Sequence, residues 1–183
     1  MTDDFVNSIK EQKKIPIIGK GSYDEIINKA ANFISRNYKI IEITLRSKNA
    51  IDAALHIKKN HSNIIIGIGS IISIDQLINI QKYNFNFYVS PGINSKMLDF
   101  CKKNQLNFIP GVSTTSEIIK GIEFNCNLFK FFHSEQSGGT KMLKSIKDIF
   151  PNIGFIPTGG INNKNYISYI NLSNVVAVGS TNF

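Results

Sequence analysis

Leu128-Phe129-Lys130-Phe131-Phe132 is a short apolar run with one lysine at its centre, and it has the composition of a β-strand. Side chains alternate between the two faces of a strand, so Lys130 shares a face with Leu128 and Phe132. If both faces are buried, Lys130 lies inside the protein, where burial favours the neutral, nucleophilic amine over the ammonium. The alternative is that Lys130 lies at a strand end and extends its ammonium to water.

Apolar runs of this kind recur about every 20–25 residues, and each except the last is followed by a stretch with helical periodicity. The predicted strands span residues 15–19, 40–44, 64–70, 85–90, 107–111, 128–132, 154–157 and 174–178. The predicted helices span residues 24–37, 49–59, 74–83, 95–104, 115–123, 140–150 and 163–170, after an amphipathic lead helix at 3–14.

Apolar strands that alternate with helices indicate parallel pairing through right-handed crossovers. Eight such units predict a (β/α)8 TIM barrel in the α/β class, formed by residues 1–183 as a single domain with an N-terminal lead helix. An open doubly wound sheet is the alternative, but no Gly-x-Gly-x-x-Gly turn follows the first strand. The last helix of the barrel is missing after strand 174–178, so we expect the outward face of that strand to need another cover.

Composition narrows the classes of function. The formal charge is +8, but the lysines are scattered and Arg36 and Arg46 are the only arginines, which argues against a nucleic-acid binder. The positive charge instead favours anionic small molecules. The polar N-terminus and the lack of a membrane-length apolar run predict a cytoplasmic protein with no membrane partner. Cys101 and Cys126 lack metal-ligand spacing, and we expect neither a metal nor a cofactor.

Residues with chemical roles in such barrels lie at the carboxyl ends of the strands. One of these ends carries Glu42, Thr44 and Arg46. Glu42 in an isoleucine-rich strand fits a general acid/base in apolar surroundings, or alternatively a structural partner of Arg46 or Lys130. Arg46 suits a bidentate hydrogen bond to a substrate carboxylate, or alternatively a surface ion pair.

The last two predicted strands end in glycines and hydroxyl residues, Thr158-Gly159-Gly160 and Gly179-Ser180-Thr181. Free backbone N–H groups at adjacent strand ends predict a phosphate site, unless the glycines only terminate the strands. Together with Lys130, Glu42 and Arg46, these loops describe a site that forms an imine with a keto acid. Such a site moves a proton at the neighbouring carbon, and it holds a carboxylate at one end and a phosphate at the other.

Six motifs follow one another along the chain: Glu42–Arg46, Gly67–Ser70, Ser90–Gly92, Ile109–Thr114, Phe129–Phe132 and Pro157–Ile161. In this order, they resemble the motifs of the 2-keto-3-deoxy-6-phosphogluconate (KDPG) aldolase family. Members of this family also act on 4-hydroxy-2-oxoglutarate (KHG).

The resemblance implies a homotrimeric (β/α)8 barrel with a metal-free class I mechanism. KDPG would be cleaved to pyruvate and glyceraldehyde 3-phosphate in the Entner–Doudoroff pathway, and KHG to pyruvate and glyoxylate. Lys130 matches the Schiff-base lysine and Glu42 the general acid/base. The residues that match substrate contacts are Arg46 and Ser70 at the pyruvate carboxylate, Pro91 as a wall, and Gly159, Gly160, Gly179, Ser180 and Thr181 at the phosphate.

The sequence departs from the family pattern at Ser70, His133 and Asn182, where threonine, proline and an aromatic residue are usual. A hydroxyl remains at Ser70, so we expect binding to be retained. His133 is interpreted as a tolerated loop change, and alternatively as a second proton carrier at the rim.

Two other functions remain open at this stage. A decayed, non-catalytic barrel would keep anion binding without turnover, and another phosphate-binding barrel, such as an isomerase, would leave Lys130 without a role. The presence of the lysine, the carboxylate and the arginine together favours the aldolase.

Overall fold

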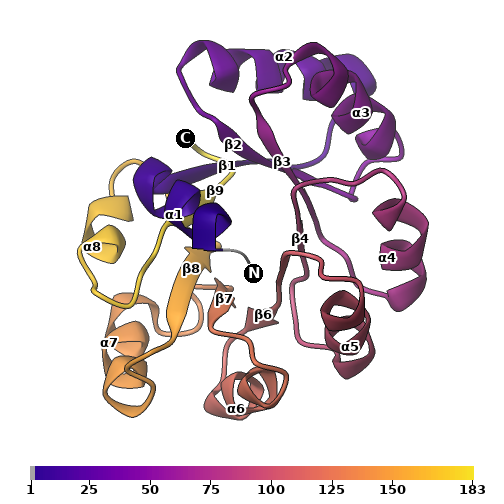
Figure 1. Cartoon of the computed structure of the whole chain (residues 1–183). Helices are drawn as coiled ribbons and strands as arrows, with labels where there is room; N and C mark the ends of the chain where they lie inside the picture. Colours follow the sequence, from indigo (N-terminus) through magenta and orange to yellow (C-terminus); the bar gives the residue numbers. More distant parts are fainter. Residues whose placement is uncertain (1–2) are drawn as a thin grey trace.

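A computed structural model describes residues 3–183 and has strands that form a nearly closed ring with helices outside it (Figure 1). Every strand ladder in this part of the chain is parallel, and the order around the ring is β5-β4-β3-β2-β1-β9-β8-β7-β6. The predicted (β/α)8 barrel is therefore confirmed. The strands are β1 (Lys14–Ile18), β2 (Ile40–Thr44), β3 (Ile65–Gly69), β4 (Phe87–Val89), β5 (Phe108–Ile109), β6 (Gly111–Val112), β7 (Leu128–Phe132), β8 (Gly154–Thr158) and β9 (Val178–Ser180).

Some of the described helices begin at a residue whose side chain caps them. Ser22 and Thr114 each form a capping box, with Glu25 and Glu117 respectively, at the starts of two helices. None of the helices in residues 3–183 combines the length and the apolar character that a membrane span needs. They are α1 (Asp3–Gln12), α2 (Tyr23–Ser35), α3 (Ala50–Asn60), α4 (Ile74–Gln81), α5 (Ser95–Lys103), α6 (Thr115–Glu123), α7 (Gly139–Ile149) and α8 (Tyr166–Ile170).

The predicted strand 107–111 is divided at Pro110. Its first part, β5, pairs with β4, and its second part, β6, pairs with β7. Proline has no N–H for a ladder hydrogen bond, so the chain changes partner at this residue, although the Pro110 carbonyl still accepts from Lys130 N. The barrel therefore closes at a proline.

Two predicted elements near the end of the chain are shorter than expected. The predicted helix 163–170 begins only at Tyr166, because the side chains of Asn162 and Asn165 hydrogen bond to nearby backbone N–H groups in a turn. The predicted strand 174–178 makes one bridge to β8, at Val175, and its regular pairing starts at Val178 in β9.

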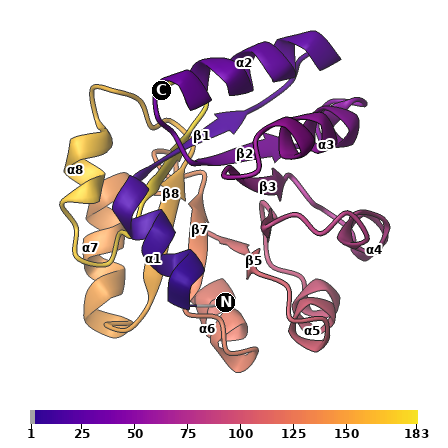
Figure 2. The ribbon, with the colours of Figure 1, turned by 45° about the horizontal axis from the view of Figure 1, so that its top comes forward.

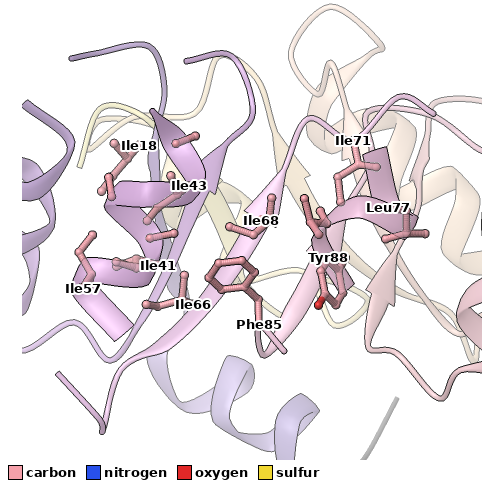
Figure 3. Close-up of a cluster of buried hydrophobic side chains, with 14 of the residues drawn as sticks. Ile18, Ile41, Ile43, Ile57, Ile66, Ile68, Ile71, Leu77, Phe85 and Tyr88 are labelled. Carbon is pink, nitrogen blue, oxygen red and sulfur yellow. The ribbon is translucent and has the colours of Figure 1, made fainter. Parts of the chain in front are cut away.

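Alternation along the strands separates an outer core from an inner one. Odd-numbered isoleucines of β2 and even-numbered isoleucines of β3 point outward and pack with helix side chains such as Ile57 and Leu77, as Figure 3 shows. In β7, Phe129 and Phe131 belong to the outer core and Leu128 to the inner one. The predicted alternation is thus confirmed, and it directs Lys130 into the barrel.

The lead helix α1 closes the amino-terminal end of the barrel (Figure 2). Phe5 and Ile9 are buried in the inner core together with Leu128 and Phe87, which begin β7 and β4. Gln12 donates to Ile40 O and accepts from Ile40 N, which fixes the helix to the start of β2. The opposite end of the barrel, at the carboxyl ends of the strands, is not covered by α1 and can hold the predicted site.

The outward side chains of the last strand region are covered. Val175 and Val178 are buried in a cluster with residues of α7 and α8 and with Phe183. The Phe183 ring lies 6.4 Å from the ring of Tyr166, and the Phe183 carbonyl accepts from Arg36 at 3.4 Å. The expected need for another cover is thus met by α8 and by the residues that follow β9.

Candidate active site

The carboxyl ends of the strands surround a cavity of about 580 Å³. Most of the residues predicted for the site line it, although they are spread over the whole sequence. They are Glu42, Arg46, Ser70, Pro91, Lys130, Thr158, Gly159, Gly160, Ser180 and Thr181.

At the floor of this cavity, Lys130 Nζ lies 3.2 Å from Glu42 Oε1. Their side chains are 9% and 5% exposed, so Lys130 does not extend to bulk water as in the alternative considered for it. A buried ammonium and carboxylate in hydrogen-bond contact can exchange a proton, which converts the pair to a neutral amine and a carboxylic acid. The geometry therefore places an amine and a carboxyl group in contact, the arrangement that an amine nucleophile needs beside a proton acceptor.

The carboxylate of Glu42 fits because β3 has no side chain opposite it. A Cβ added at Gly69 would lie 2.0 Å from Glu42 Oε1, which is far too close for two non-bonded atoms. Glycine at position 69 is therefore required for the position that Glu42 takes beside Lys130. In the sequence, Gly69 is only part of the predicted strand 64–70 and of the Gly67–Ser70 motif, and neither predicts this role.

Arg46 lies at the edge of the cavity, away from the buried pair. Its Nε donates to Thr44 Oγ1 at 3.1 Å, and this hydroxyl in turn donates to Ile18 O at 3.2 Å. A Cβ at Gly19 would lie 3.2 Å from Arg46 Nη2, so the guanidinium rests over the end of β1. Within residues 3–183 Arg46 forms no ion pair, which leaves its remaining donors available to an anion.

Two loops form the wall of the cavity near β3 and β6. Ser70 follows β3 with a left-handed φ of 61°, which turns the chain sharply at the cavity edge. Pro91 packs closely against β6 at Gly111. A Cβ at Gly111 would lie 2.2 Å from the Pro91 carbonyl oxygen, so this approach requires glycine. Both predicted residues thus occupy defined positions on the wall.

The loop after β8 has the backbone geometry of an anion site. Gly159 and Gly160 have φ of 99° and 81°, values that glycine adopts at little cost. Within the described residues, the N–H groups of these two glycines donate to no other protein group. Successive unpaired N–H groups form a concave donor surface suited to a phosphate.

The predicted residues of the loop after β9 also make contacts within the protein. The Ser180 hydroxyl donates to Ile161 O and accepts from Asn182 N, so it joins two loops at the cavity edge. Gly179 does not line the main cavity, and a Cβ there would lie 2.5 Å from Thr158 Oγ1. Gly179 therefore makes room for Thr158. Thr181 and Asn182 follow at the cavity edge, and within residues 3–183 their side chains form no hydrogen bond to the protein.

Sequence reasoning did not assign some cavity residues. Ile72 and Gln76 contribute to the wall, and the side-chain Oε1 of Gln76 accepts from Ile72 N at 2.8 Å. His133, noted only as a departure, is exposed at the rim beside Phe132. In the part of the chain that the structure covers, no three His, Cys, Asp or Glu side chains are grouped as metal ligands.

The profile of the family described as "KDPG and KHG aldolase" matches residues 5–183. A 2-dehydro-3-deoxy-phosphogluconate aldolase of Pseudoalteromonas atlantica is 36% identical over 167 residues, which are 91% of this chain and 78% of the relative.

Two solved structures are also similar to this chain. The KDPG aldolase of Legionella pneumophila, with pyruvate captured as a covalent carbinolamine intermediate, has a TM-score of 0.91 and 33% identity, covering 96% of this chain and 85% of that one. The KDPG aldolase of Zymomonas mobilis with 3-phosphoglycerate has a TM-score of 0.90 and 25% identity, covering 96% and 84%. The profile match over nearly the whole chain, together with a relative of this identity, shows that the chain belongs to the KDPG and KHG aldolase family.

Proposed function

We propose that the chain is a class I aldolase, an aldehyde-lyase that cleaves KDPG to pyruvate and glyceraldehyde 3-phosphate and also cleaves KHG to pyruvate and glyoxylate. The observation that carries the proposal is the buried contact between Lys130 Nζ and Glu42 Oε1 at the floor of the cavity. The carbinolamine of pyruvate in the Legionella relative is the intermediate that such a lysine forms.

Catalysis begins with proton transfer from the Lys130 ammonium to Glu42. The neutral amine then attacks the C2 carbonyl of the substrate, and the resulting carbinolamine loses its hydroxyl as water when Glu42 returns the proton. The product is an iminium ion on Lys130, which can accept electrons from the adjacent C3–C4 bond.

The bond breaks when Glu42, now a carboxylate, removes the proton of the C4 hydroxyl. The electrons of the C3–C4 bond move into the iminium, which leaves an enamine on Lys130 and releases the aldehyde. Protonation of the enamine at C3 and hydrolysis of the imine release pyruvate and restore the amine.

The two ends of the substrate are assigned to opposite sides of the cavity. Arg46 and Ser70 bind the pyruvate carboxylate, with Pro91 as a wall. The donors of the phosphate site are the N–H groups of Gly159 and Gly160 and the hydroxyl of Thr181, with Thr158 beside them. The two glycine N–H groups are unpaired within residues 3–183, and all four residues line the cavity. The Thr158 hydroxyl itself donates to Ile156 O at 3.4 Å. Ser180 and Gly179 support this loop from within.

The other functions considered for the sequence are less well supported. A non-catalytic barrel gives no reason to bury a lysine against a carboxylate, since apolar residues of similar size are usually as stable there. An isomerase would use the phosphate loops but not the Lys130–Glu42 pair.

Substrate preference tests the phosphate end of this proposal. We expect kcat/KM to be higher for KDPG than for KHG, because a remote anion supplies binding energy. Thr181→Ala should reduce this preference about tenfold through loss of a hydrogen bond to a charged group. Ser62→Ala, at an exposed position after α3 and outside the cavity lining, is the matched control and should leave the preference unchanged. A preference that survives Thr181→Ala would remove Thr181 from the phosphate site.

We further propose that residues 1–183 act as one domain in a cytoplasmic homotrimer. Ile119 and Ile122 lie one turn apart on α6 and are 51% and 39% exposed, an apolar surface of the kind that a subunit contact covers. Light scattering is expected to give three times the chain mass of 20.5 kDa. A monomer mass at micromolar concentration would contradict the trimer.

A further inference from the structure

The Gly159-Gly160 turn is supported from behind by the loop that follows β7. Ser134 N donates to Thr158 O at 2.8 Å, and Glu135 N donates to Gly159 O at 3.1 Å. These bonds use the carbonyl groups of the turn and leave the N–H groups of its two glycines unpaired within residues 3–183. The loop thus fixes the orientation of the donors proposed for phosphate.

The side chain of Glu135 packs directly on this turn. A Cβ at Gly160 would lie 2.4 Å from Glu135 Cγ, and one at Gly159 would lie 3.2 Å from His133 Cα. The stem of Glu135 therefore occupies the space beside Gly160 and packs against the turn.

Tyr169 of α8 holds the carboxylate end of Glu135. The Tyr169 hydroxyl donates a hydrogen bond to Glu135 Oε1, and Tyr169 is only 1% exposed although Glu135 is at the surface. Gly139 makes room for the hydroxyl, because a Cβ there would lie 2.9 Å from it. Burial, with the hydrogen bond to Glu135, raises the pKa of Tyr169 to about 12, so the hydroxyl keeps its proton and remains a donor at neutral pH.

We propose that Glu135 and Tyr169 are positioning residues for the phosphate end of the substrate. Their hydrogen bond holds the Glu135 stem against Gly160 and so keeps the N–H groups of the turn aimed at one point. The bond also fixes a carboxylate that would otherwise be free to approach a bound phosphate and repel it. This inference rests on the phosphate site proposed above, and neither residue contacts the reacting atoms.

The test uses the full chain with Tyr169→Phe, Glu135→Ala, Glu135→Gln and the double variant Y169F/E135A. In Tyr169→Phe and Glu135→Ala, we expect kcat/KM for KDPG to fall through KM by up to about a hundredfold, the effect that a misplacement of about 1 Å can have. Cleavage of KHG, which has no phosphate, should not change. Glutamine keeps an oxygen that accepts from Tyr169, so Glu135→Gln should retain the wild-type preference for KDPG.

Because one hydrogen bond is involved, the double variant should be no worse than the poorer single variant. Equal losses on KDPG and KHG, or a Glu135→Gln variant as impaired as Glu135→Ala, would overturn the positioning role. Borohydride trapping of pyruvate on Lys130 checks that each variant is folded, and if Tyr169→Phe fails this check, the variants of the surface residue Glu135 decide the question.

Failure of this inference is distinguishable from failure of the proposed function. If the wild type prefers KDPG and both Tyr169→Phe and Glu135→Ala keep that preference, only the positioning role is wrong. If the wild type itself shows no preference for KDPG over KHG, the phosphate site is wrong and the positioning role falls with it.

Discussion

Replacement of Lys130 with methionine is expected to abolish KDPG cleavage, with a loss of roughly 10⁴–10⁶-fold, the range seen when an activated catalytic group is removed. Methionine has a similar length but no amine, so no imine forms and the C3–C4 bond has no electron acceptor. Lys130→Arg is the second variant, because arginine keeps a positive charge beside Glu42 and still forms no imine.

Lys141→Met is the matched control for this substitution, since Lys141 is exposed on α7 and does not line the cavity. It should cleave KDPG at the wild-type rate. If both Lys130 variants retained turnover within about a hundredfold of wild type, the amine would not be the nucleophile and the cavity would need another mechanism.

Glu42→Gln is expected to lower kcat by ~10²–10⁴-fold, the usual contribution of a general acid/base. Glutamine has nearly the same shape and can still accept a hydrogen bond from Lys130 Nζ. Imine formation with pyruvate should be slower, because water replaces Glu42 as the proton carrier, but it should still go to completion. What is lost is the group that removes the C4 hydroxyl proton. The measurements are steady-state cleavage of KDPG and borohydride trapping of pyruvate on the same sample.

Glu11→Gln, at an exposed position on α1 and outside the cavity lining, provides the control for loss of one negative charge. Near-normal cleavage by Glu42→Gln would show that Glu42 only pairs with Lys130 in a structural role. Loss of both cleavage and trapping would instead show that water cannot replace Glu42 as the proton carrier in imine formation.

Much of the fold was predictable because it depends on local patterns. The alternation of apolar runs and helical stretches indicated the barrel, and period-two alternation placed Lys130 inside. The errors lie where one residue changes the backbone pairing. Pro110 divides a strand because it lacks an N–H, and the asparagine side chains of residues 162–165 bond to the backbone where a helix was expected.

The site was predictable from a general rule, that strand ends in a barrel converge, but its details were not. Glu42 and Lys130 are 88 residues apart, and the rule brings them to one end without giving the 3.2 Å contact. The space at Gly69, the use of the Ser180 hydroxyl between loops, and the Tyr169–Glu135 bond depend on packing between distant segments. Residue types and spacing contain no local signal for such contacts.

Borohydride reduction in the presence of pyruvate measures where the Schiff base forms. The chain is incubated with pyruvate, reduced, digested and analysed by mass spectrometry, with a sample lacking pyruvate and the Lys130→Arg variant as controls. The expected result is a reduced pyruvyl adduct on the peptide that contains Lys130, absent from both controls. No adduct on the wild-type chain, or an adduct on a different lysine, would contradict the assignment of Lys130 as the nucleophile of a class I aldolase.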